Sequence, residues 1–307
     1  MRVLRRQVAR MRELLKASAA TTVRGRGSLS LIERFIEVEG ARIRCLDEGQ
    51  GERTVLLWPG LGGTAEAFSR LLRDGAARDY RMVALDPPGH GRSDRMPLRG
   101  GAGAAAIFEA ARDAVSAARA VIGGHSYGAV AALAALGASQ DLLRRTAGLV
   151  LYDGGYLSAD DDGHAQCERQ IAGFTFATWD EYLAAVRAEA RRWDDDMEEG
   201  ARAMMVEREG RIRLRIDVAS CEDAMRLIAA HAPGLLPRIE VAPAVLLRAG
   251  SPAEMETERG EGVAALRAKV PALEVRRVAD ASHELLDEAP GPVAEETWAF
   301  LERADWR

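Results

Sequence analysis

A serine stands between glycines near the middle of the chain, in the segment G-H-S-Y-G at residues 124–128. An apolar, β-prone run at 120–122 enters this segment, and an alanine-rich run with good helix propensity at 129–136 leaves it. So sharp a turn from strand to helix exposes the side chain of Ser126, and the small Gly124 and Gly128 let strand and helix approach. A serine there can be the nucleophile of acyl-transfer chemistry; the alternative is a structural serine at a turn.

Acyl transfer also needs a base that deprotonates the nucleophile, and His283 is the best-placed histidine. It follows the last expected strand in A-S-H-E at 281–284, where its side chain can reach back to the strand ends. The other four histidines lie in tight glycine-rich turns, beside the serine or in a charged middle block, and they are poorer candidates: His90, His125, His164 and His231.

Two carboxylates could orient the base. Asp153 comes directly at the end of the expected strand 148–152 and is followed by two glycines, which favours a rigid position. Its alternative role is to cap that turn with its own side chain. Glu254 lies in the loop after the following strand and has a longer side chain beside other glutamates. We expect Asp153 to be the acid and keep Glu254 as the alternative.

Backbone N–H groups should stabilise the oxyanion. The expected donors are Tyr127, which follows the nucleophile, and Leu61, in the glycine-rich turn P-G-L-G-G-T at 59–64. That turn has neither the G-x-G-x-x-G spacing of a dinucleotide site nor the lysine of a P-loop, so we expect no nucleotide cofactor. The three cysteines are widely spaced and form no metal-ligand pattern, and we expect no metal.

Alternating strand and helix patterns must position these residues. They run through residues 31–155 and 238–307, which predicts a mostly parallel sheet with helices on both faces. Residues 156–237 carry more charge and helical patterns around 178–192, 196–209 and 220–231. We interpret this block as a helical cap over the carboxyl ends of the strands, where ligands bind in open α/β sheets.

The motifs together resemble the α/β-hydrolase superfamily. The resemblance covers residues 32–155 and 238–305 and rests on P-G-L-G-G at 59–63, D-P-P-G-H-G-R-S-D at 86–94, the pentapeptide and the late His283. It implies an eight-stranded, mostly parallel sheet with the second strand antiparallel and a cap inserted after the sixth strand. Two positions depart from common family patterns. Pro59 stands where many members have histidine, and Ala253 stands where the loop after the seventh strand often has aspartate.

Charge and composition limit the other classes. The net charge of −5 argues against nucleic acid as a partner. The sequence contains no run of eighteen apolar residues, so we expect no membrane span. Residues 1–30 form a separate basic extension with the spacing of an amphipathic helix, which could lie on an anionic membrane or a partner, pack on its own domain or remain a solvated tail. The widely spaced cysteines fit a reducing compartment, so we expect a cytoplasmic protein and leave a homodimer open.

These observations predict a serine hydrolase of a small-molecule carboxylic ester or related acyl compound. A lactonase, a thioesterase or a carbon–carbon bond hydrolase would use the same residues. A ligand-binding receptor on the same scaffold is the non-enzymatic alternative.

Overall fold

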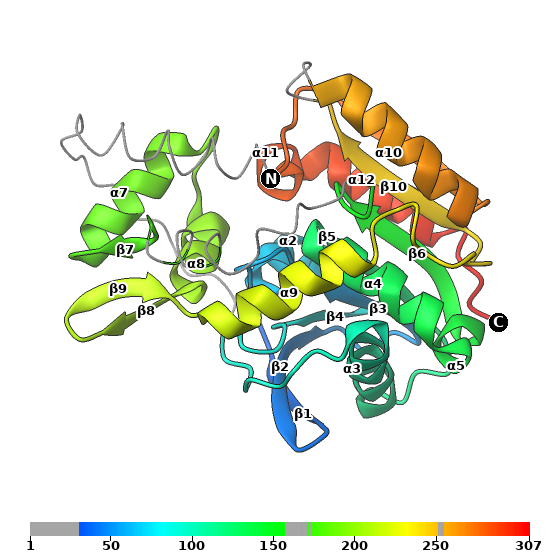
Figure 1. Ribbon diagram of the computed structural model, residues 1–307, viewed down its shortest axis with the longest axis horizontal. Helices are drawn as coiled ribbons and strands as arrows, with labels where there is room; N and C mark the ends of the chain where they lie inside the picture. The colour runs from blue at the N-terminus through cyan, green and yellow to red at the C-terminus, as the bar shows by residue number, and fades with distance from the viewer. Residues whose placement is uncertain (1–30, 157–166, 168–170, 172, 251–254) are drawn as a thin grey trace.

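Eight strands form the central sheet of the computed structural model, which describes residues 31–156, 167, 171, 173–250 and 255–307 (Figure 1). The strand order is β1-β2-β4-β3-β5-β6-β10-β11. Strand β2 runs antiparallel to both of its neighbours and the other pairs are parallel, so the predicted sheet is confirmed. The strands are β1 (Glu33–Val38), β2 (Ala41–Glu48), β3 (Arg53–Trp58), β4 (Tyr80–Leu85), β5 (Ala120–His125), β6 (Thr146–Tyr152), β10 (Ala244–Ala249) and β11 (Leu273–Val278).

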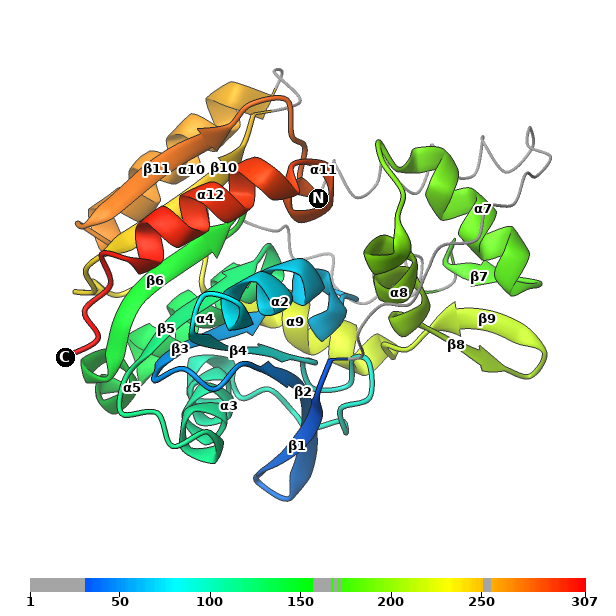
Figure 2. The same cartoon turned by 180° about the vertical axis from the view of Figure 1, so that it is seen from behind.

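Helices cover both faces of this sheet. Helices α3, α4 and α10 pack on one face, and α2 and α12 pack on the other (Figures 1 and 2). Successive strand residues point to opposite faces, so the buried strands contribute apolar side chains to both layers. The helices of the core are η1 (Ala65–Phe68), α2 (Ser69–Ala76), α3 (Gly100–Ala114), α4 (Tyr127–Ala138), α5 (Gln140–Arg144), α10 (Glu256–Lys269), α11 (Leu285–Glu288) and α12 (Pro290–Leu301).

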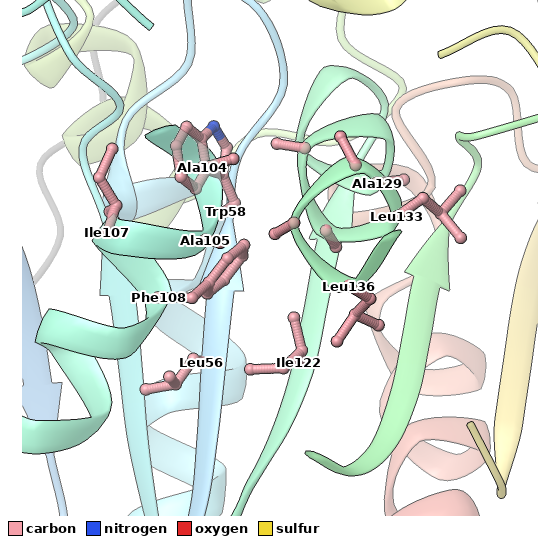
Figure 3. Packing of buried hydrophobic residues seen from close by; sticks show 14 of the residues in the cluster. Leu56, Trp58, Ala104, Ala105, Ile107, Phe108, Ile122, Ala129, Leu133 and Leu136 are labelled. Atoms are coloured by element: carbon pink, nitrogen blue, oxygen red, sulfur yellow. The ribbon is translucent and has the colours of Figure 1, made fainter. Parts of the chain in front are cut away.

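The helix that follows Ser126 is fixed by close packing. Alanines and leucines of α4 pack against α3 and the sheet, with Trp58 and Phe108 between them (Figure 3). The rings of Trp58 and Phe108 lie 5.4 Å apart. A side chain at Gly101 would come within 2.3 Å of the carbonyl oxygen of Ala134, so α3 and α4 can approach only at small residues. This packing holds the start of α4, and with it Ser126.

The segment between β6 and β10 contains a second, smaller sheet that the sequence patterns did not predict. Its strands β7 (Thr175–Phe176), β8 (Met205–Arg208) and β9 (Arg211–Leu214) are antiparallel and accompany α7 (Trp179–Glu189), α8 (Asp195–Ala203) and α9 (Val218–Ala230). The helix predicted over 196–209 is therefore wrong in its second half. Glu209 and Gly210 both have positive φ, the geometry of a two-residue hairpin turn between β8 and β9.

Residues 174–214, here called the α7–β9 lobe, have a separate apolar cluster that includes Phe176, Tyr182 and Met205. The basic helix predicted within residues 1–30 lies outside the described residues, as do Ala253 and Glu254. None of the helices in the described part of the chain is long and apolar enough to cross a bilayer.

Candidate active site

Ser126 lies in a tight turn between β5 and α4, here called the nucleophile elbow (residues 124–128). Its φ of 54° and ψ of −114° are a conformation that costs a non-glycine residue energy and that the surrounding packing must impose. A Cβ on Gly124 would come within 2.3 Å of the carbonyl carbon of Gly128. One on Gly128 would come within 1.9 Å of the oxygen of Trp58. Both glycines therefore permit the close approach that the sequence analysis assigned to them.

His283 reaches Ser126 from the far end of the chain. It belongs to residues 279–284, here called the base loop, which joins β11 to α11. Its Nε2 lies 2.8 Å from Oγ of Ser126, and its Nδ1 lies 2.8 Å from Oδ2 of Asp153. A carboxylate can only accept, so Nδ1 donates to Asp153 and Nε2 is free to accept the serine proton. The structure thus joins these three predicted residues in one hydrogen-bonded chain.

Asp153 is held on every side at the end of β6. It is 4% exposed and has a φ of 39°. Its Oδ1 accepts from the backbone N–H of Ala249 at 2.7 Å and from the hydroxyl of Tyr156 at 2.5 Å, which leaves Oδ2 for His283. A Cβ on Gly154 would come within 2.4 Å of the oxygen of Ser126, so this glycine lets the end of β6 lie against the elbow. Sequence reasoning missed Tyr156.

The charges of Asp153 and His283 stabilise each other. Burial by itself would raise the pKa of Asp153, but hydrogen bonds from His283 and Tyr156 more than offset it and lower that pKa. Burial by itself would lower the pKa of His283, but the bond to Asp153 and the nearby charges of Glu284 and Asp153 raise it above its ordinary value of 6.5. The arrangement therefore favours an ionised acid that stabilises a protonated imidazole.

The two residues expected to bind an oxyanion are Tyr127 and Leu61. Tyr127 is the first residue of α4, where the backbone N–H groups have no acceptor within the helix. Residues 59–64 follow β3 and lie against the elbow. A Cβ on Gly60, next to Leu61, would be 3.5 Å from Cβ of Ser126. Backbone donors near Ser126 would suit a developing negative charge.

The remaining histidines serve other contacts. His90 is buried in its turn, with Nδ1 3.0 Å from the oxygen of Pro88, and His231 contacts the oxygen of Leu227 in its own helix. His164 lies outside the described residues. His125 differs from these because its Nε2 lies 2.8 Å from the backbone oxygen of His283. The described part of the chain brings together no group of three or more side chains of the kinds that could hold a metal ion.

Comparison with known proteins places this chain in a family. Residues 55–296 match the alpha/beta hydrolase family. A stretch of 60 residues is 43% identical to the dihydrolipoyllysine-residue acetyltransferase component of the acetoin cleaving system from Cupriavidus necator. That stretch is 20% of this chain and only 16% of that protein, so the match spans a small part of either.

Solved structures share the fold over nearly the whole length. One is E-2-(acetamidomethylene)succinate hydrolase, with a TM-score of 0.71 and 18% identity over 89% of this chain and 100% of that one. Another is a thioesterase domain from the curacin biosynthetic pathway, with a TM-score of 0.67 and 18% identity over 88% and 100%. At this identity the structures establish the fold alone, and the chemistry must be argued from the residues of this chain.

Proposed function

The chain belongs to the alpha/beta hydrolase family, and from this premise we propose that it is a serine hydrolase of a carboxylic ester or related acyl compound. The observation that carries the proposal is the continuous chain from Oγ of Ser126 through His283 to Asp153, with 2.8 Å at each link. Nucleophile, base and orienting acid at hydrogen-bond distance are what acyl transfer to a serine requires.

The first half of the proposed reaction forms an acyl-enzyme. Oγ of Ser126 attacks the acyl carbon while Nε2 of His283 takes its proton, and Asp153 stabilises the imidazolium. The N–H groups of Leu61 and Tyr127 stabilise the oxyanion of the tetrahedral intermediate. When that intermediate collapses, the bond to the leaving group breaks and Nε2 gives its proton to the departing alkoxide, which leaves as an alcohol.

Water completes the reaction by the same groups. Nε2 of His283 takes a proton from water, the resulting hydroxide attacks the acyl carbon, and a second tetrahedral intermediate forms. Its collapse breaks the bond to Oγ, the proton on Nε2 returns to Ser126, and the carboxylic acid is released. With the substrate and one water as the reactants, the bonds and protons of both halves balance.

Asp153 is the acid of this proposal. Its carboxylate already contacts Nδ1 of His283 and is fixed by two further donors, whereas Glu254 lies outside the described residues. A short side chain held at a strand end orients an imidazole better than a long one in a loop.

Labelling and turnover test the proposal together. The intact chain should react with a fluorophosphonate and hydrolyse p-nitrophenyl esters. Ser126→Ala should remove both activities, with a loss of about a thousandfold or more if the three residues act as a unit. An intact chain that neither labels nor turns over, or a Ser126→Ala variant as active as the parent, would refute it.

The class of acyl compound is decided by a substrate panel. The same reaction steps apply to oxygen esters, thioesters and lactones, because each presents a carbonyl carbon with a leaving group. We expect the highest kcat/KM among oxygen esters in a panel from acetyl to long-chain esters with matched thioesters and lactones. A preference of tenfold or more for another class would reassign the substrate without removing Ser126.

A further inference from the structure

We propose that His125 is a positioning residue: its imidazole ties the base loop to the nucleophile elbow, so that His283 meets Ser126. The inference rests on the proposed function and adds a residue that acts through His283 without touching the substrate. His125 comes directly before the proposed nucleophile, Ser126, in the chain.

The geometry gives His283 two attachments to neighbouring residues of the elbow. Oγ of Ser126 contacts its ring at Nε2, and the ring of His125 contacts its backbone oxygen, each at 2.8 Å. The two imidazole rings lie 4.9 Å apart at an angle of 37°. One attachment orients the side chain and the other holds the main chain from which it projects, so together they limit how the ring can shift.

The protonation state of His125 follows from its surroundings. Its side chain is 6% exposed, and burial, followed by the nearby charge of His283, lowers its pKa. Glu284 and Asp153 act in the opposite direction and are outweighed. A neutral imidazole carries one proton, and a carbonyl acceptor at Nε2 places that proton there. A neutral ring is also compatible with the positive charge that His283 acquires during the reaction.

A purely structural histidine would look different. His90 and His231 are also bonded to carbonyl oxygens, but their acceptors, Pro88 and Leu227, lie two and four residues away. The acceptor of His125 lies 158 residues away, in the loop that supplies the proposed base. Other contacts also hold this loop, where Ala281 accepts from Gly250, Ser282 donates to Glu288 and Asp280 accepts from Arg191, but none of these partners belongs to the elbow.

Three substitutions separate the hydrogen bond from the packing. His125→Gln keeps an N–H donor near the position of Nε2. His125→Asn has a side chain too short for its N–H to reach the backbone oxygen of His283, and His125→Leu keeps the bulk without a donor. His231→Leu is the matched control, because it removes another histidine bonded to a carbonyl oxygen. Each variant is measured for kcat and KM on a p-nitrophenyl ester, for fluorophosphonate labelling rate, and for thermal unfolding.

We expect the Asn and Leu variants to lose about 10- to 100-fold in kcat with KM within about twofold, because a misplacement of about 1 Å can cost about 100-fold. Their labelling rates should fall in parallel, while the Gln variant and the control stay within about threefold of the parent. Equal loss in the Gln and Asn variants, or parental kcat in the Leu variant, would overturn the inference and leave the proposed function standing. An intact chain without labelling or turnover would instead remove the function on which it rests.

Discussion

Two regions of the molecule are built from different interactions. One is the set of strand ends of the central sheet that carries Ser126, here called the sheet edge, and the other is the α7–β9 lobe. Ser126, Asp153 and His283 follow strands β5, β6 and β11 of one sheet, and their contacts are hydrogen bonds of 2.8 Å among largely buried groups. The lobe has its own apolar cluster. Its helix α8 lies beside α2 of the core (Figure 2), and ion pairs join the two segments. These pairs join Arg70 to Asp194 and Asp196, and Arg73 to Asp196 and Glu199.

The difference separates positioning from attachment. Buried, fully bonded groups hold one geometry, because leaving a partner unsatisfied costs about 1–3 kcal/mol. The side chains of the α8–α2 ion pairs are 24–39% exposed, and such pairs contribute about 0–1 kcal/mol each and weaken with salt. We therefore expect substitutions at the sheet edge to change kcat, and substitutions between α8 and α2 to act mainly on KM.

Among substitutions at the sheet edge, Asp153→Asn should cause the largest loss of kcat. The amide can present the wrong hydrogen-bonding group to Nδ1 of His283, and a base in the wrong tautomer costs about 10⁴-fold in kcat. The measurement is ester turnover, with Glu254→Gln as the matched control at parental rate. A crippled Glu254→Gln and an active Asp153→Asn would transfer the role of the acid to Glu254.

The pH profile tests the charge arrangement of the same edge. Because the pKa of His283 is raised above 6.5, the imidazole is protonated below that raised value and cannot accept the proton of Ser126. The limiting kcat/KM should thus be reached at higher pH and fall about tenfold per unit once the pH is well below the pKa. The acidic midpoint, measured with a substrate that does not titrate, should lie above 6.5. A midpoint below 6.5 would contradict the arrangement.

Tyr156→Phe should lower kcat by a smaller factor than Asp153→Asn. The variant removes one donor to Asp153 and leaves the N–H of Ala249 and the ring of His283. Loss of one hydrogen bond of about 1 kcal/mol corresponds to about fivefold in kcat. Tyr182→Phe is the control, since that buried hydroxyl bonds to Ala201 inside the lobe. Equal effects of the two variants would mean that the loss arises from general destabilisation.

The smallest effect on kcat should come from the ion pairs. Arg70→Ala combined with Arg73→Ala should leave kcat within about twofold and change KM, because each pair contributes about 0–1 kcal/mol. Added salt should move the KM of the parent toward that of the variant and leave the variant itself unchanged. Arg303→Ala, which removes a pair with Glu274 on the core surface, is the control. A large fall in kcat in the double variant would show that the lobe helps to hold the sheet edge.

Local patterns predicted much of the fold. The strands and helices of the core follow from alternation and from the glycines of the elbow, and the β1–β2 hairpin turns at Glu39 and Gly40, which both have positive φ. Two segments differ from a simple helix pattern. The helical segment that starts at Ala65 begins as a 3₁₀ turn, where the N–H of Ala65 donates to Asp86. Strand β8 fell within the helix predicted over 196–209 because a short charged strand resembles a polar helix; the Glu209–Gly210 turn was the available signal.

The site residues whose positions follow from the order of strands and helices could be predicted. Those whose contacts depend on the direction of a side chain could not. The late histidine and the serine could be paired from the order of elements, and the structure brings them to 2.8 Å. The sequence favoured Asp153 and left Glu254 as the alternative, because the residues that follow either strand can face the base. The contacts of Tyr156 and His125 depend on which way a ring turns in the fold, and no spacing in the sequence encodes that.

Trapping the acyl-enzyme tests the central claim most directly. The intact chain is mixed with a p-nitrophenyl ester, quenched in acid before the acyl group is released, and digested for mass spectrometry, with the burst of nitrophenol counted against chain concentration. We predict a burst of about one equivalent and an acyl group on the peptide that contains Ser126, both absent in Ser126→Ala. Turnover with no burst and no acylated Ser126, or an acyl group on another residue, would contradict the account.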